Sequence, residues 1–192
     1  MKFDTKAIHA GVEPDPATGA IMTPIYQTST YVQEEVGVHK GFEYSRTQNP
    51  TRSALESSLA ALENAKFGAC FSSGLAAIDC LLKMLEPGDE VISTYDLYGG
   101  TYRLFNTVFA KYGIKFYHIS LDDPAKVAEI ANEKTKMVWI ETPTNPMLHI
   151  FDIRAISNAV KDFDAMVVVD NTFCTPYIQN PLDMGADVVM HS

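Results

Sequence analysis

One apolar stretch of the chain ends in a side chain that could do chemistry. Four apolar residues, Met166 to Val169, are followed directly by Asp170 and then by Asn171 and Thr172. Aspartate is depleted in strands, and burying a carboxylate without a partner is costly. In open α/β sheets, ligands bind beyond the carboxyl ends of the strands, so we expect Asp170 to face a binding site. A helix cap is the structural alternative.

A second candidate lies in the run Phe71-Ser72-Ser73-Gly74-Leu75-Ala76-Ala77, which the pattern places between a strand and a helix. Free backbone N–H groups, the helix dipole and the Ser73 hydroxyl would together bind an anion such as phosphate. The run matches neither G-x-G-x-x-G nor G-x-x-x-x-G-K-[ST], which disfavours a dinucleotide or a nucleoside triphosphate. A capped helix with a closely packed glycine is the alternative.

Tyr98 and Asn145 follow two further apolar runs. Tyr98 comes after residues 90–94, so a flat ligand could stack on its ring at the same sheet edge, although a ring that covers a helix start is the alternative. Asn145 lies in Glu141-Thr142-Pro143-Thr144-Asn145-Pro146, where two prolines restrict the turn. Its amide can serve a ligand oxygen or can satisfy the turn backbone.

Together these residues suit one cofactor. Pyridoxal phosphate has a phosphate, a flat ring, and a ring nitrogen that needs a carboxylate to stay protonated and act as an electron sink. Asp170 could supply this carboxylate. Other constellations are weaker, because the five histidines show no metal-ligand spacing and neither C-x-x-C nor G-x-S-x-G occurs.

The elements that must position these residues alternate along the chain. We expect a helix from residue 51 with Thr51 as its cap, and further helices over 75–85, 100–112, 124–133 and 152–162. Strands are expected over 67–72, 90–94, 114–120, 136–141, 165–170 and 187–191. This order predicts a three-layer α/β domain over residues 51–192, in which a mainly parallel sheet has helices on both faces. Residues 1–50 lack sustained periodicity and are interpreted as an arm.

Composition narrows the class of protein. The 192 residues are 46% hydrophobic and carry a net charge of -9 with scattered acids, which disfavours nucleic acids and anionic membranes as partners. A small-molecule or protein partner is favoured. Cys70, Cys80 and Cys174 are far apart, which is typical of a reducing compartment. No apolar run approaches 18 residues, so we expect a soluble, cytoplasmic protein without a membrane span.

With these residues in view, the chain resembles the Cys/Met-metabolism family of pyridoxal-phosphate enzymes, the transsulfuration group that includes cystathionine γ-synthase and γ-lyase. The resemblance covers nearly the whole chain and implies the large domain of a fold type I enzyme. It rests on ordered motifs: Thr5-x-x-Ile8-His9-x-Gly11, Pro24-Ile25, Tyr44-Ser45-Arg46, Asn49-Pro50-Thr51-Arg52, Ser73-Gly74-Leu75-Ala76-Ala77, Tyr98-Gly99-Gly100, Glu141-Thr142-Pro143-x-Asn145-Pro146, Asp170-Asn171-Thr172 and Gly185-Ala186-Asp187.

The resemblance also implies roles for single residues. Tyr98 would stack on the pyridine ring and handle protons, Asp170 would pair with the ring nitrogen, and Asn145 would lie near the ring hydroxyl. Thr172 would support the ring and Asp170. The phosphate would be held by Ser73, Gly74, Leu75 and Ser192, and by Tyr44 and Arg46 reaching over from a neighbouring subunit. The resemblance therefore implies an active site shared across a dimer, within a homotetramer built as a dimer of dimers.

The chain departs from the family at its end. Family members continue from the Ser192 position through a small residue and a threonine to the lysine that binds the cofactor covalently, and no lysine of this chain fits that position. We expect a large domain that is incomplete at its C-terminus. Either the chain is a fragment, or the sequence is interrupted at a cofactor-modified lysine, and the position of the break favours the second interpretation. The domain that carries the arginine for the substrate carboxylate would also lie beyond Ser192.

The activity that the resemblance implies is γ-elimination or γ-replacement on a sulfur amino acid or an activated homoserine. Cystathionine γ-synthase and γ-lyase stay unresolved, and an O-acetylhomoserine sulfhydrylase is a further alternative. Methionine γ-lyases usually carry Tyr-Gly-Cys where this chain has Tyr98-Gly99-Gly100, which disfavours that activity. A catalytically dead assembly partner is the alternative from outside the enzymes, suggested by the missing lysine.

Overall fold

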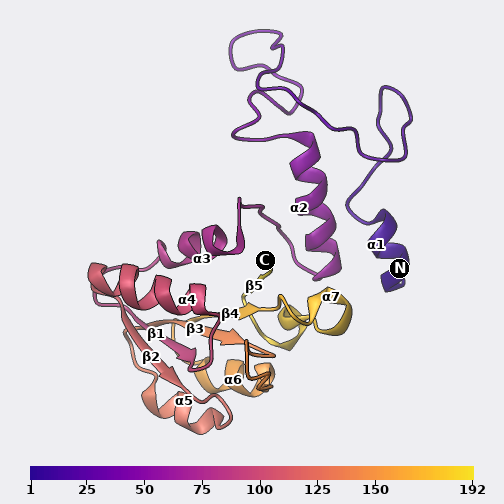
Figure 1. The fold of residues 1–192 in the computed structure, drawn as a ribbon. Helices are drawn as coiled ribbons and strands as arrows, with labels where there is room; N and C mark the ends of the chain where they lie inside the picture. Colours follow the sequence, from indigo (N-terminus) through magenta and orange to yellow (C-terminus); the bar gives the residue numbers. More distant parts are fainter. The chain divides into compact units, whose positions relative to one another are not determined.

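A computed structural model describes residues 1–192, and the chain divides into two compact units (Figure 1). The first unit is Met1–Cys70 and the second is Phe71–Ser192. The predicted division at residue 50 and the reach of the arm to a neighbouring subunit stay predictions. No helix of the structure has the length and apolarity needed to cross a membrane.

The second unit contains a five-stranded parallel sheet in the order β2-β1-β3-β4-β5 (Figure 1). Its strands are β1 (Glu90–Thr94), β2 (Lys115–Ile119), β3 (Thr135–Glu141), β4 (Met166–Asp170) and β5 (Val188–Met190). Five of the six predicted strands are confirmed. The prediction of a strand over 67–72 was wrong, because this run forms no ladder and Phe67 and Phe71 are exposed.

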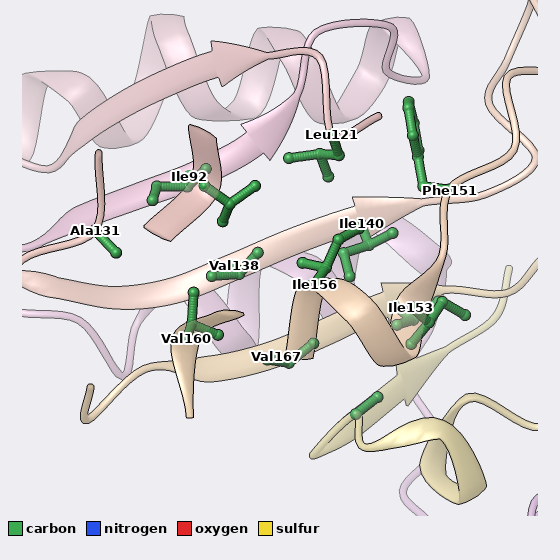
Figure 2. Close-up of a cluster of buried hydrophobic side chains, with 13 residues drawn as sticks. Ile92, Leu121, Ala131, Val138, Ile140, Phe151, Ile153, Ile156, Val160 and Val167 are labelled. Atoms are coloured by element: carbon green, nitrogen blue, oxygen red, sulfur yellow. The ribbon is translucent and has the colours of Figure 1, made fainter. Parts of the chain in front are cut away.

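Helices cover both faces of the sheet, as the apolar runs predicted (Figure 1). Successive strand residues point to opposite faces, so nearly every position of a central strand is buried. One core packs β1, β3 and β4 against α5 (Pro124–Ile130) and α6 (Ile153–Val160), and Figure 2 shows its side chains meeting between these layers. The other core contains Trp139 and packs the opposite face against α3 (Gly74–Leu82) and Phe105.

The helix predicted over 100–112 is three short pieces. These are α4 (Gly99–Arg103), a π-helical turn (Leu104–Val108) and a 3-10 turn (Phe109–Tyr112). The Asn106 amide donates to the Tyr102 carbonyl at 2.9 Å, and the Thr107 hydroxyl donates to the Arg103 carbonyl. Such side-chain bonds compete with the backbone ladder for the same carbonyls, which accounts for the altered helix.

The first unit contains α1 (Phe3–His9), α2 (Pro50–Leu62) and irregular segments between them. The cap of α2 differs from the prediction, because Asn49 accepts from the Thr51 N–H at 2.9 Å, whereas the Thr51 hydroxyl donates to the Pro24 carbonyl. An asparagine directly before a proline at the first helical position is a strong start signal. The sequence analysis also missed two short helices of the second unit, α7 (Thr175–Ile178) and the 3-10 helix Pro181–Met184.

Candidate functional site

The carboxyl edge of the sheet holds a cavity of about 250 Å³. The strand order reverses direction between β1 and β3, and such switch points open a crevice at the carboxyl ends of the strands. Residues from the ends of four strands and the loops that follow them line the cavity: Tyr98, Glu141, Pro143, Asn145, Asp170, Thr172, Phe173 and Ser192. A hollow of about 370 Å³ in the first unit, near Tyr31 and Phe42, involves none of the buried acids described below.

Asp170 lies at the end of β4 and is only 8% exposed. Its Oδ1 accepts from the Thr172 hydroxyl at 2.6 Å and from the Thr172 N–H at 3.1 Å, while Oδ2 accepts no hydrogen bond within the chain. Burial raises the pKa of this carboxyl, and the bonds from Thr172 and the charge of His191 oppose the rise. Asp170 caps no helix, so its second oxygen is available to a cation in the cavity.

Glu141 is the second buried acid of the cavity, and the sequence analysis gave it no role. It ends β3 in register with Asp170 on β4 and is 4% exposed. Its Oε1 accepts from the Asn145 N–H at 2.8 Å, and its Oε2 accepts from the Tyr98 N–H at 2.9 Å. The pKa of Glu141 is raised to about 7, mainly by burial and also by the nearby carboxylates of Asp170 and Asp96, while the two backbone bonds oppose the rise.

Tyr98 and Asn145, whose backbone N–H groups donate to Glu141, also line the cavity. The Tyr98 ring is 46% exposed and packs against Gly100, where an added Cβ would come within 2.4 Å of the ring. The Asn145 side chain makes no hydrogen bond within the chain, so it does not satisfy the turn backbone as the alternative proposed. An aromatic face and a free amide are therefore both present at the cavity.

The predicted phosphate-binding residues lie at the start of α3 and at Ser192. The Ser73 hydroxyl accepts from the Ala76 N–H at 3.1 Å and caps α3, whose first N–H groups have no acceptor within the helix. A Cβ at Gly74 would come within 2.6 Å of the Ser192 Oγ, so only glycine permits this approach. The Ser192 N–H donates to the Thr172 hydroxyl at 3.1 Å, which links this end to the Asp170 end.

Five predicted residues are not among those that line the cavity: Ser73 and Gly74, described above, and Leu75, Tyr44 and Arg46. Leu75 is 37% exposed in the first turn of α3, where it offers its backbone N–H. Tyr44 and Arg46 belong to the first unit, where the guanidinium lies 5.0 Å from the centre of the Tyr44 ring and donates to its hydroxyl. Their contact with a phosphate in a neighbouring subunit stays a prediction.

The structure thus brings five predicted residues together around one cavity, namely Tyr98, Asn145, Asp170, Thr172 and Ser192. The sequence analysis missed Glu141, Pro143 and Phe173 as lining residues. For Glu141 a signal existed, because it ends an apolar strand in the same way as Asp170 does.

An open parallel sheet with two buried acids, an aromatic ring and a helix N-terminus at its carboxyl edge defines an α/β protein suited to a flat ligand with one cationic and one anionic end. Residues 4–192 match the family described as Cys/Met metabolism PLP-dependent enzyme, and the chain belongs to this family. The resemblance drawn from the motifs is confirmed.

Relatives of several named activities are similar to the chain. A probable cystathionine γ-synthase from Herpetosiphon aurantiacus is 51% identical over 190 residues, which are 99% of this chain and 60% of that protein. A cystathionine β-lyase from Coxiella burnetii is 50% identical over 99% of this chain and 49% of that protein. The crystal structure of metB from Corynebacterium glutamicum superimposes with a TM-score of 0.98 at 47% identity, over 100% of this chain and 50% of that one. The chain spans about half the length of these relatives.

The residues present fit the family's cofactor, pyridoxal phosphate. Burial raises the pKa of both acids, so their charged forms are poorly stabilised, and a protonated ring nitrogen would place a further positive charge beside Asp170. The α3 N-terminus, close to the Ser192 hydroxyl because residue 74 is glycine, suits a phosphate. The Tyr98 ring can stack on a flat ligand between these two ends.

Proposed function

We propose that the full-length protein uses pyridoxal phosphate to process sulfur amino acids or activated homoserine by γ-elimination or γ-replacement. The observation that carries the proposal is the Asp170 carboxylate, which is buried at the carboxyl edge with one oxygen held by Thr172 and the other left available. Family membership and the names of the relatives support the same reaction class. Their names also include a β-lyase, an activity that the sequence analysis did not consider.

When bound, the cofactor would supply an electron sink for negative charge that develops on the substrate. Asp170 would pair with the ring nitrogen and keep it protonated, and Thr172 would hold Asp170 in place through the two bonds to Oδ1. Tyr98 would stack on the ring and hold or move a proton at its hydroxyl, and Asn145 would donate its amide to the ring hydroxyl.

The phosphate would be held by the backbone N–H groups of Gly74 and Leu75 and by the hydroxyls of Ser73 and Ser192. Tyr44 and Arg46 would complete this site from a neighbouring subunit, which requires a dimer, and we infer a dimer of dimers as the whole assembly. An arginine suits this task because its planar guanidinium matches phosphate oxygens in pairs.

We infer the cytoplasm as the compartment. Cys70, Cys80 and Cys174 are all unpaired, as expected of a protein kept in a reducing environment. The substrate would be a small amino acid. We expect neither a nucleic acid nor a membrane as a partner.

The test of the cofactor role is Asp170→Asn in the full-length protein. An amide keeps the size of the side chain but cannot hold a ring nitrogen protonated, so we expect kcat/KM to fall by about 100-fold or more. The fold should persist, as judged by far-UV circular dichroism. Near-normal turnover in this variant would refute the role given to Asp170.

Substrate assays separate the candidate activities. Steady-state rates with cystathionine, and with O-succinyl- or O-acetylhomoserine plus cysteine, distinguish a lyase from a synthase. Pyruvate released from cystathionine together with homocysteine would indicate β-elimination, and 2-oxobutyrate with cysteine would indicate γ-elimination. Sulfide as the preferred acceptor of activated homoserine would favour a sulfhydrylase.

A further inference from the structure

We propose that Glu141 is a positioning residue that holds Tyr98 and Asn145, the two residues proposed to contact the cofactor ring, in place. The inference rests on the proposed function and adds a residue to it. Glu141 would act on the ring through the Tyr98 aromatic face and on the ring hydroxyl through the Asn145 amide.

The geometry of the Glu141 carboxylate carries the proposal. Each oxygen accepts one backbone N–H, and the two donors belong to different loops: Tyr98 follows β1, and Asn145 follows β3. The two bonds measure 2.9 and 2.8 Å, and the side chain is 4% exposed, so water competes little for either donor. One planar group therefore fixes the distance between the backbone that carries the aromatic ring and the backbone that carries the amide.

Only a carboxylate of this length can make both contacts. Glutamine has the same shape, but its NH₂ group would face one of the two N–H donors, so one bond would be replaced by a repulsive contact. Aspartate keeps two acceptor oxygens but is shorter by one methylene, so it cannot reach both loops from the same backbone position. A buried N–H without an acceptor is costly, and its loop would shift to find one.

The charges around Glu141 show why a site would keep such a group. The charged groups that act on it are Asp170 from β4 and Asp96 from the loop after β1, and both are acids. Both neighbours raise the pKa of Glu141, as burial does. A cationic ring nitrogen beside Asp170 would instead lower the pKa of Glu141. The Glu141 carboxylate would in turn favour the protonated form of the cofactor.

Asp96 offers a matched control. Its Oδ2 accepts from the Thr144 hydroxyl at 2.5 Å and from the Met147 N–H at 3.1 Å, so it also joins the loop after β1 to the loop after β3. It does not line the cavity. Asp96→Ala removes both of these bonds, so a general loss of loop order should follow from it as much as from Glu141→Gln. A loss specific to the ring site should follow from Glu141→Gln alone.

The experiment compares full-length wild type, Glu141→Gln, Glu141→Asp and Asp96→Ala after cofactor removal. Affinity for pyridoxal phosphate is measured by equilibrium dialysis, and the near-UV and visible circular dichroism of the bound cofactor reports its orientation. We expect Glu141→Gln to bind roughly 10- to 100-fold more weakly, as for loss of a buried hydrogen bond to a charged group, with an altered dichroic band. Glu141→Asp should lose affinity in the same direction, and Asp96→Ala should stay within about threefold of wild type.

The outcomes separate this inference from the proposed function. Wild-type affinity and an unchanged dichroic band in Glu141→Gln would overturn the positioning role while the proposed function stands. An equal loss in Asp96→Ala would overturn it too, because loop order alone would then explain the effect. If Glu141→Gln does not fold, Glu141→Asp decides the question by the same two readouts. A wild-type protein that binds no pyridoxal phosphate would refute the proposed function itself.

Discussion

Asp170 and Glu141 lie opposite each other at the ends of β4 and β3, and their hydrogen-bond partners differ. Both oxygens of Glu141 accept backbone N–H groups, whereas Asp170 keeps one oxygen without a partner in the chain. The first arrangement suits a residue that holds loops in place, and the second suits one that meets a ligand. Neither acid has a lysine or arginine among the charges that shift its pKa.

The raised pKa of Glu141 predicts how stability depends on pH without the cofactor. Its folded pKa is about 7 against an ordinary 4.5, so between these values the native state holds a proton that the unfolded chain has lost. The free energy of unfolding should therefore fall as the pH rises from about 4.5 to 7, and this contribution should level off above it. At most roughly 3 kcal/mol is involved.

Glu141→Gln should flatten this dependence, because an amide does not titrate. Urea denaturation of the cofactor-free, full-length protein at several pH values between 5 and 8 measures the slope. Glu129→Gln is the control, since Glu129 is an exposed residue of α5. Equal slopes for wild type and Glu141→Gln would contradict the prediction.

At the scale of the element, the start of α4 sets the position of the Tyr98 ring. An added Cβ at Gly100 would lie 2.4 Å from the ring, whereas one at Gly99 would meet only the Arg103 Nη1, at 3.4 Å. Gly100→Ala should therefore push the ring out of place and weaken pyridoxal phosphate binding by about tenfold, the size expected for losing ring stacking. Gly99→Ala should leave the affinity within about twofold, because nothing rigid lies beside it.

Thermal denaturation supplies the second readout for this pair of variants. Alanine favours a helix over glycine by about 1 kcal/mol, so Gly99→Ala should not lower the melting temperature. A loss of affinity confined to Gly100→Ala is the expected result. Equal affinities in both variants would show that α4 does not position the ring.

At the scale of the whole molecule, the prediction concerns Arg46 and a shared active site. Arg46→Ala should weaken cofactor binding, because the guanidinium would no longer contact the phosphate from the neighbouring subunit. If the site is shared, mixing full-length Arg46→Ala subunits with Asp170→Asn subunits creates some sites in which both residues are intact. Partial recovery of activity in the mixture is the expected outcome. No recovery despite proven subunit exchange, followed by native mass spectrometry, would exclude a site shared in this way.

Much of the fold and part of the site could be predicted from the sequence. The strands β3 and β4 each contain a run of four apolar residues, because a parallel strand covered on both faces buries nearly every side chain. Asp170 stood out because a carboxylate at the end of such a run needs a partner. The run Phe67 to Ser72 was predicted as a strand because of its apolar composition. It makes no strand pairing, and both of its phenylalanines are exposed.

Only the tertiary structure decided what Glu141 does. Its motif was visible, but its partners were not, because the Tyr98 N–H lies 43 positions earlier in the chain and Asp170 lies opposite it through strand register. The approach of Ser192 to Gly74 likewise depends on how α3 and the end of β5 pack. Local patterns specify which strands form and which side chains end them. The distances between those ends depend on sheet order and register, which arise from contacts between residues far apart in the sequence.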